Sequence, residues 1–109
     1  PTIVHQDPSI QFNDEVFGPI FTLIPFENDP EAIQIANSTP YGLGGAVFSG
    51  DHHRAYSLAM NMDTGSVAVN DFFRSAPERP FGGVKYSGYG RELGEEGFYE
   101  FVNRKVIVK

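Results

Sequence analysis

Two adjacent residues, Arg74 and Ser75, have side chains that could together bind a carboxylate. A guanidinium offers a planar set of N–H donors that matches the two oxygens of a carboxylate, and a serine hydroxyl adds one more donor. Consecutive loop residues need not point the same way, so the alternative is that Arg74 faces solvent or pairs with Asp71 or Glu78. The pair therefore marks a candidate anion-binding site.

Two further patterns suggest chemistry that their spacing does not support. Residues 88–94 (GYGRELG) have the spacing GxGxxxG and follow a loop instead of a strand, which argues against a dinucleotide phosphate loop. His52 and His53 are adjacent at the predicted start of a helix and have no carboxylate at a ligand-like spacing of four residues. We expect solvent-exposed histidines and no metal site.

The amino-acid composition argues against several classes of function for this chain. The 109 residues include no cysteine, so the chain itself forms no thiol nucleophile, disulfide, zinc–thiolate site or iron–sulfur cluster. Fourteen acidic residues against eight Lys and Arg argue against a nucleic-acid partner, because phosphate binding is driven by basic side chains. No apolar run approaches the roughly 20 residues that span a bilayer. We expect a soluble, cytoplasmic protein with no nucleic-acid or membrane partner.

The first half of the chain predicts a strand followed by a helix. Residues 20–26 (IFTLIPF) are a nearly continuous apolar run, which is typical of a strand buried on both faces. Asp29 is predicted to cap the following helix, with Pro30 at its first position and residues 37–40 (NSTP) ending it.

The same pattern then repeats. Residues 45–49 predict a second buried strand, Asp51 a helix cap, and residues 66–70 a third strand. Between them an apolar stripe with helical spacing is formed by Ala55, Leu58, Ala59 and Met62. Strands that alternate with helices through short loops predict an α/β fold, with a mostly parallel sheet covered by helices.

Residues 71–90 and the end of the chain differ from this pattern. Residues 71–90 combine prolines, glycines and phenylalanines in a long loop, and long loops in compact domains usually serve a function. A short helix is predicted near residues 95–101 and an alternating strand at 105–109 (KVIVK). Such a terminal edge strand is expected to pair with another segment or subunit.

Four segments resemble the aldehyde dehydrogenase superfamily. They are residues 15–20 (EVFGPI), 39–48 (TPYGLGGAVF), 65–70 (GSVAVN) and 80–92 (PFGGVKYSGYGRE). Their order and spacing are those of the family, and together they cover nearly the whole chain. The resemblance implies the C-terminal part of the catalytic domain at residues 1–101, including the loop 71–90. Residues 102–109 would be a terminal strand for assembly into a homo-oligomer.

The resemblance also implies a reaction. A cysteine thiolate attacks an aldehyde, the thiohemiacetal passes a hydride to NAD or NADP, and water hydrolyses the thioester. In the family the cysteine, the general-base glutamate, the oxyanion-site asparagine and most of the cofactor-binding domain lie upstream of these motifs. Since the sequence starts at Pro1 without a Met, we expect preceding sequence. The partner is then the remainder of the parent enzyme, and the chain alone is expected to be inactive.

Three residues match the cofactor-binding positions of the family. Glu15 corresponds to the carboxylate that accepts hydrogen bonds from the nicotinamide ribose, Phe17 to an aromatic residue packed near the nicotinamide, and Leu43 to a residue beside it. The alternatives are a solvated acid for Glu15 and core packing for Phe17 and Leu43. Asn70 is expected only to satisfy backbone groups of its loop. The choice between NAD and NADP stays open, because residues that contact the adenosine ribose lie upstream.

The candidate substrate-binding residues are Phe81 and two residues of the loop before it. Phe81 corresponds to an aromatic residue that lines the aldehyde pocket, and packing within its loop is the alternative. The sequence of the loop 70–77 resembles that of succinate semialdehyde dehydrogenases. The resemblance implies that Arg74 and Ser75 hold the distal carboxylate of this substrate. A different class of function is a non-catalytic interaction module that keeps the fold and acts through its exposed strand edges.

Overall fold

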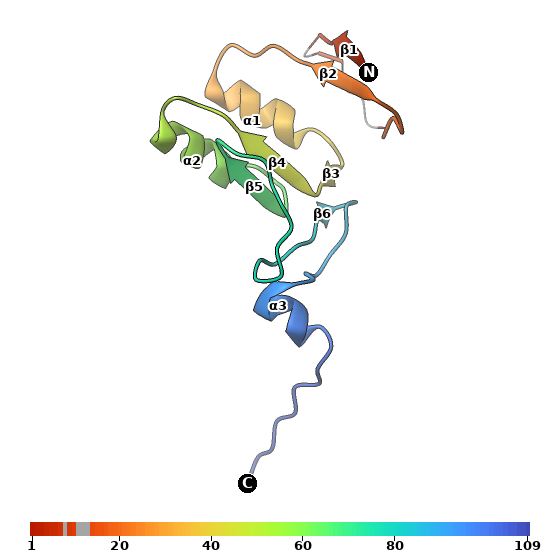
Figure 1. Ribbon diagram of the computed structural model, residues 1–109, viewed down its shortest axis with the longest axis vertical. Helices are drawn as coiled ribbons and strands as arrows, with labels where there is room; N and C mark the ends of the chain where they lie inside the picture. Colours follow the sequence, from red (N-terminus) through yellow and green to blue (C-terminus); the bar gives the residue numbers. More distant parts are fainter. Residues whose placement is uncertain (8, 11–13) are drawn as a thin grey trace.

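The computed structural model describes residues 1–7, 9–10 and 14–109, and within them each helix follows two successive strands along the chain (Figure 1). The elements are β1 (Thr2–His5), β2 (Ile20–Leu23), α1 (Asp29–Asn37), β3 (Tyr41–Gly42), β4 (Gly44–Val47), α2 (His52–Met60), β5 (Ser66–Val69), β6 (Val84–Lys85) and α3 (Gly94–Tyr99).

The strands form three two-stranded sheets within the described residues. β1 pairs with β2 and β4 pairs with β5, both in parallel, whereas the short β3 and β6 pair antiparallel with Tyr41 opposite Lys85. The predicted α/β class with parallel strands is therefore confirmed. Instead of one continuous sheet, the described residues form separate pairs.

The prediction that residues 20–26 form a strand buried on both faces is wrong for this chain. β2 ends at Leu23, and Ile20, Phe21 and Leu23 are all exposed. β2 pairs only with β1 among the described residues, and this two-stranded sheet leaves both of its faces open. The apolar side chains of β2 are exposed because no helix or strand of the described residues covers them. β1 itself is a strand that we did not predict.

The cap of α1 lies one residue earlier than predicted. Asn28, not Asp29, is the N-cap: its Oδ1 accepts a hydrogen bond from the backbone N–H of Glu31 at 3.0 Å. Asp29 instead lies in the first turn and pairs with Arg54 of α2 at 2.5 Å. The hydrogen bond from Arg54 lowers the pKa of Asp29 below its ordinary value. Asp29 therefore joins the two helices at the surface.

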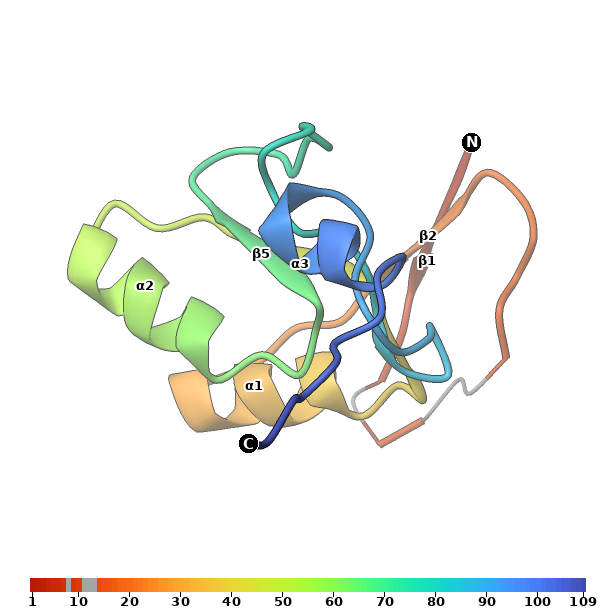
Figure 2. The ribbon, with the colours of Figure 1, turned by 90° about the horizontal axis from the view of Figure 1, so that it is seen from below.

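The β4–β5 pair and α2 form the central packed unit. Asp51 caps α2 as predicted, accepting hydrogen bonds from the backbone N–H groups of His53 at 2.9 Å and Arg54 at 3.1 Å. α2 contacts both β4 and β5, and Ala55 at that contact is fully buried. Figure 1 and Figure 2 show α1 and α2 near the β4–β5 pair, and Figure 1 shows α3 beyond the end of that pair, next to the C-terminal tail.

The end of the chain has less regular secondary structure than predicted. α3 covers Gly94–Tyr99 instead of 95–101, and residues 105–109 have no strand. Val106, Ile107 and Val108 are exposed on a tail that extends away from the rest of the chain (Figure 1). A strand requires a partner for its backbone groups, and the tail has none among the described residues. Its role in assembly stays a prediction. No helix within the described ranges is long and apolar enough to cross a membrane.

Candidate functional site

A hollow of about 650 Å³ lies beside Glu15. The segment that runs from the end of α1 through β3 into β4 forms much of its wall, contributing Thr39, Tyr41, Gly42, Leu43 and Gly44. Ser87 lies on the same hollow. Two of the predicted cofactor-binding residues, Glu15 and Leu43, are thus brought together although 28 positions separate them in the sequence.

Glycines allow the backbone segments behind this wall to come close together. The backbone N–H of Gly65 donates to the carbonyl of Gly42 at 3.1 Å. A Cβ at Gly42 would overlap the carbonyl oxygen of Asp63, and a Cβ at Gly65 would overlap that of Gly82. Any larger residue at these positions would force the segments apart, so the two glycines fix the position of the wall.

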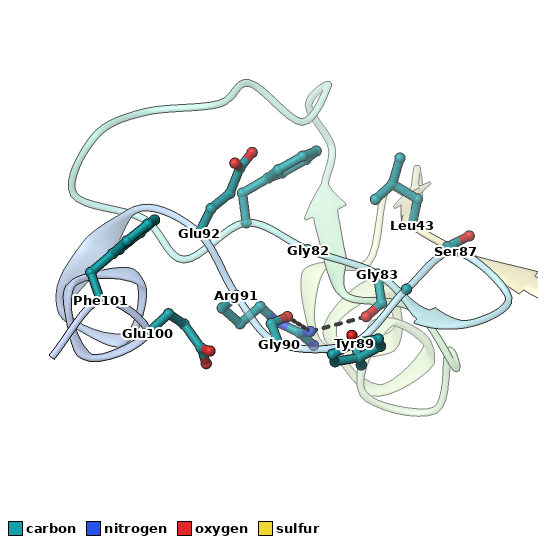
Figure 3. Close-up of a pocket in the computed structure, with 12 residues that line it drawn as sticks. Leu43, Gly82, Gly83, Ser87, Tyr89, Gly90, Arg91, Glu92, Glu100 and Phe101 are labelled. Carbon is teal, nitrogen blue, oxygen red and sulfur yellow. Dashed lines mark hydrogen bonds between the residues drawn. The ribbon is translucent and has the colours of Figure 1, made fainter. Parts of the chain in front are cut away.

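A second hollow, of about 360 Å³, adjoins the first and is lined by Phe81. Figure 3 shows this hollow, with Leu43, Ser87 and Arg91 among its labelled residues. The guanidinium of Arg91 lies at its edge and donates to the backbone carbonyls of Gly83 at 3.0 Å and Gly90 at 2.6 Å. Leu43 and Ser87 line both hollows. Two of the predicted cofactor-binding residues, Glu15 and Leu43, and one predicted substrate-binding residue, Phe81, therefore lie on neighbouring hollows.

The aromatic residues of the prediction differ in their surroundings. Phe17 is 97% exposed, so packing in a core of the described residues does not explain it. Phe81 is half-buried, and its ring stacks on that of Phe73 with centroids 5.8 Å apart. Phe81 therefore both packs within its loop and lines the second hollow.

The candidate anion-binding residues lie apart from both hollows. Arg74 and Ser75 are exposed, and neither belongs to the residues that line the two hollows in the described part of the chain. In that same part, Arg74 forms no ion pair with Asp71 or Glu78. Their binding of a carboxylate stays a prediction.

Asn70 has the local role that we expect. Its Nδ2 donates to the carbonyl of Ser49 at 2.9 Å and its Oδ1 accepts from the N–H of Ser49 at 2.8 Å, which joins the ends of β4 and β5. Within the described ranges no group of His, Cys, Asp or Glu could hold a metal ion, and His52 and His53 are exposed.

Sequence reasoning missed Ser87 and Lys85. The Oγ of Ser87 accepts a hydrogen bond from the N–H of Gly42 at 2.9 Å, and Lys85 bonds to the end of α1. Both residues belong to the motif at 80–92. The signal available in the sequence was the run of consecutive polar side chains at residues 85–87, which follows two glycines and one valine.

Comparison with known proteins decides the family. The sequence model of the aldehyde dehydrogenase family matches residues 1–107. The chain belongs to the aldehyde dehydrogenase family.

Relatives of several named specificities match the chain. It is 47% identical to a succinate-semialdehyde dehydrogenase [NADP(+)] of Deinococcus radiodurans, covering 88% of this chain and 20% of that protein. It is 45% identical to the geranial dehydrogenase of Castellaniella defragrans, over 86% of this chain and 20% of that one. The crystal structure of betaine aldehyde dehydrogenase from Staphylococcus aureus in complex with NAD+ is similar with a TM-score of 0.83 and 45% identity, over 91% of this chain and 20% of that chain. The chain therefore spans about a fifth of the length of these relatives.

Proposed function

We propose that this chain is part of an NAD(P)-dependent aldehyde dehydrogenase that oxidises an aldehyde to a carboxylic acid. It contributes residues that bind the cofactor ribose and line the substrate pocket, whereas the catalytic cysteine lies outside it. The observation that carries the proposal is the adjacency of two hollows, one lined by Glu15 and the other by Phe81, with Leu43 and Ser87 on both. A reaction between a cofactor and a substrate requires that their binding sites lie next to each other, so that the reacting atoms come close together.

The residues around Glu15 fit a nicotinamide nucleotide. An ionised carboxylate only accepts hydrogen bonds, and the neighbouring hydroxyls of a ribose are donors. Leu43 supplies an apolar wall to the same hollow, and the exposed ring of Phe17 is free to pack on a flat heterocycle. When bound, the nicotinamide supplies a hydride acceptor. In this proposal Glu15 holds the ribose, and Phe17 and Leu43 orient the nicotinamide ring.

The substrate end is proposed from Phe81 and its loop. An aromatic wall at Phe81 would exclude water while the aldehyde carbon reacts. We assign the distal carboxylate of succinate semialdehyde to Arg74 and Ser75. Ser75 follows Phe73 by two residues, and the stacking of Phe73 on Phe81 ties this loop to the second hollow. The naming of the Deinococcus radiodurans relative supports this substrate.

The C-terminal tail is proposed to take part in assembly of a homo-oligomer. Its apolar side chains at Val106, Ile107 and Val108 are all at least 80% exposed. An alternating segment with unpaired backbone groups gains hydrogen bonds by joining the edge of another sheet. We further propose a cytoplasmic location for the assembled enzyme.

The proposed function is tested on the whole protein that carries this chain and on the isolated 109-residue chain side by side. With an aldehyde and NAD+ or NADP+, the whole protein is expected to form reduced cofactor. The isolated chain is expected to form none, because it has no thiol. Absence of reduction by the whole protein across aliphatic, aromatic and semialdehyde substrates would contradict the activity. Turnover by the isolated chain, with contaminating enzyme excluded by mass spectrometry, would contradict the division of the site.

A further inference from the structure

Lys85 lies where three segments of the chain meet. Its ammonium nitrogen donates hydrogen bonds to the backbone carbonyl oxygens of Asn37 at 2.8 Å and Thr39 at 3.2 Å, at the C-terminal end of α1. The same nitrogen lies 3.8 Å from the carboxylate of Asp63, in the loop that follows α2. The last carbonyls of a helix lack partners within the helix and carry partial negative charge, so a cation is favourable there.

The side chain of Asn37 completes the connection between the two helices. Its Nδ2 donates to the carbonyl of Asn61 at 2.9 Å, and its Oδ1 accepts from the N–H of Asp63 at 2.8 Å. Asn37 therefore binds the loop after α2 with its side chain while its own carbonyl accepts from Lys85. The end of α1, this loop and β6 belong to one hydrogen-bond network.

The two residues after Lys85 extend the network to β3. The N–H of Tyr86 donates to the carbonyl of Pro40 at 3.0 Å, and the Oγ of Ser87 accepts from the N–H of Gly42 at 2.9 Å. Residues 85–87 thus hold residues 37–42 by both main-chain and side-chain bonds. Thr39, Tyr41 and Gly42 of that segment form the wall of the hollow beside Glu15.

The backbone of Lys85 supports a positioning role. Lys85 has a φ of +55°, in the left-handed region that residues with a side chain rarely adopt. Such a conformation persists where the surroundings hold it in place. Here the ammonium group is bonded to two carbonyls, so the side chain and the unusual backbone constrain each other.

We propose that Lys85 is a positioning residue for the nicotinamide cofactor. Lys85 lines neither hollow; it acts through residues 37–42, which it fixes so that Leu43 and Glu15 face the same ligand. The inference rests on the proposed function, because the ligand of the hollow is taken to be the nicotinamide ribose.

The test uses Lys85→Met, which keeps most of the side-chain volume and removes the charged donor. In the whole protein, the Kd for NAD+ or NADP+, measured by calorimetry, is expected to rise about tenfold, the scale on which hydrogen bonds from charged donors contribute. The KM for the cofactor should rise with it, while kcat at saturating cofactor changes less. Hydrogen exchange at the amides of Gly42 and Tyr86 should become faster. Lys85→Arg should restore most of the affinity, since a guanidinium donates to the same carbonyls.

Asp63→Asn provides a matched comparison. It removes the more distant ion-pair partner but leaves both carbonyls of the network, so its effect on Kd should stay below about fivefold. An effect as large as that of Lys85→Met would overturn the assignment to the carbonyls, and so would unchanged Kd and unchanged exchange in Lys85→Met. If Lys85→Met does not fold, Lys85→Gln decides instead: weaker cofactor binding supports the role and wild-type binding overturns it. Failure of the unmutated protein to bind either cofactor would overturn the proposed function itself, whereas amide exchange would still show whether Lys85 holds residues 37–42.

Discussion

At the scale of single residues, a motif can assign some site residues and not others. Glu15 and Leu43 were assigned to the cofactor from the motifs that contain them, and they line one hollow in the structure. Their proximity does not follow from periodicity, because Glu15 lies in a segment without regular structure. Lys85 and Ser87 could not be assigned from sequence, since their roles depend on which carbonyl and amide lie opposite them in space.

The substrate is best tested at Ser75. In the whole protein, Ser75→Ala is expected to raise the KM for succinate semialdehyde at least about tenfold, the scale of the loss of one hydrogen bond to a charged group. The KM for an uncharged aldehyde of similar length should not change, because the interaction lies at the distal carboxylate. Steady-state kinetics with both substrates measures the difference. Equal changes for the two aldehydes would remove Ser75 from the substrate site and leave a generic aldehyde dehydrogenase.

At the level of elements, helices with caps were predicted well and short strands were not. The cap at Asp51 has its expected hydrogen bonds, and the cap of α1 moved by one residue because Asn28 and Asp29 are both good capping residues. β3 and β6 contain two residues each, too few to show a period of two. Tertiary contacts between the 80–92 motif and the end of α1 create them.

The close approach of the loops behind the site gives a prediction about Gly65. Gly65→Ala should destabilise the whole protein by about 1–3 kcal/mol, because its Cβ would overlap the backbone carbonyl of Gly82 and neither backbone can move without disturbing the wall of the hollow. Gly50→Ala is the matched control, since a Cβ there meets nothing within 4 Å. Thermal unfolding of both variants measures the effect. Equal midpoints for Gly65→Ala and Gly50→Ala would show that the loops do not approach each other as described.

At the level of the whole molecule, burial is the property that the sequence predicted least well. The apolar run at 20–26 and the alternating tail at 105–109 both have the composition of buried or paired strands, yet their side chains are exposed among the described residues. A hydrophobic pattern predicts that an apolar surface will be covered by other protein atoms. It does not say whether those atoms belong to the same chain. The α/β class was predictable because the alternation of strand and helix patterns is local in the sequence, whereas the layer that covers a strand depends on contacts between distant segments.

The central claim is that this chain supplies the cofactor side of an active site whose nucleophile lies elsewhere. Single-turnover hydride transfer in the whole protein tests it most directly, with Glu15→Gln as the variant and Glu27→Gln, an exposed acid outside both hollows, as the control. Glu15→Gln should slow hydride transfer by about 10²-fold, because a poorly held nicotinamide is misplaced relative to the reacting carbon. Glu27→Gln should transfer hydride at the unmutated rate. Equal rates for the unmutated protein and both variants would contradict the claim.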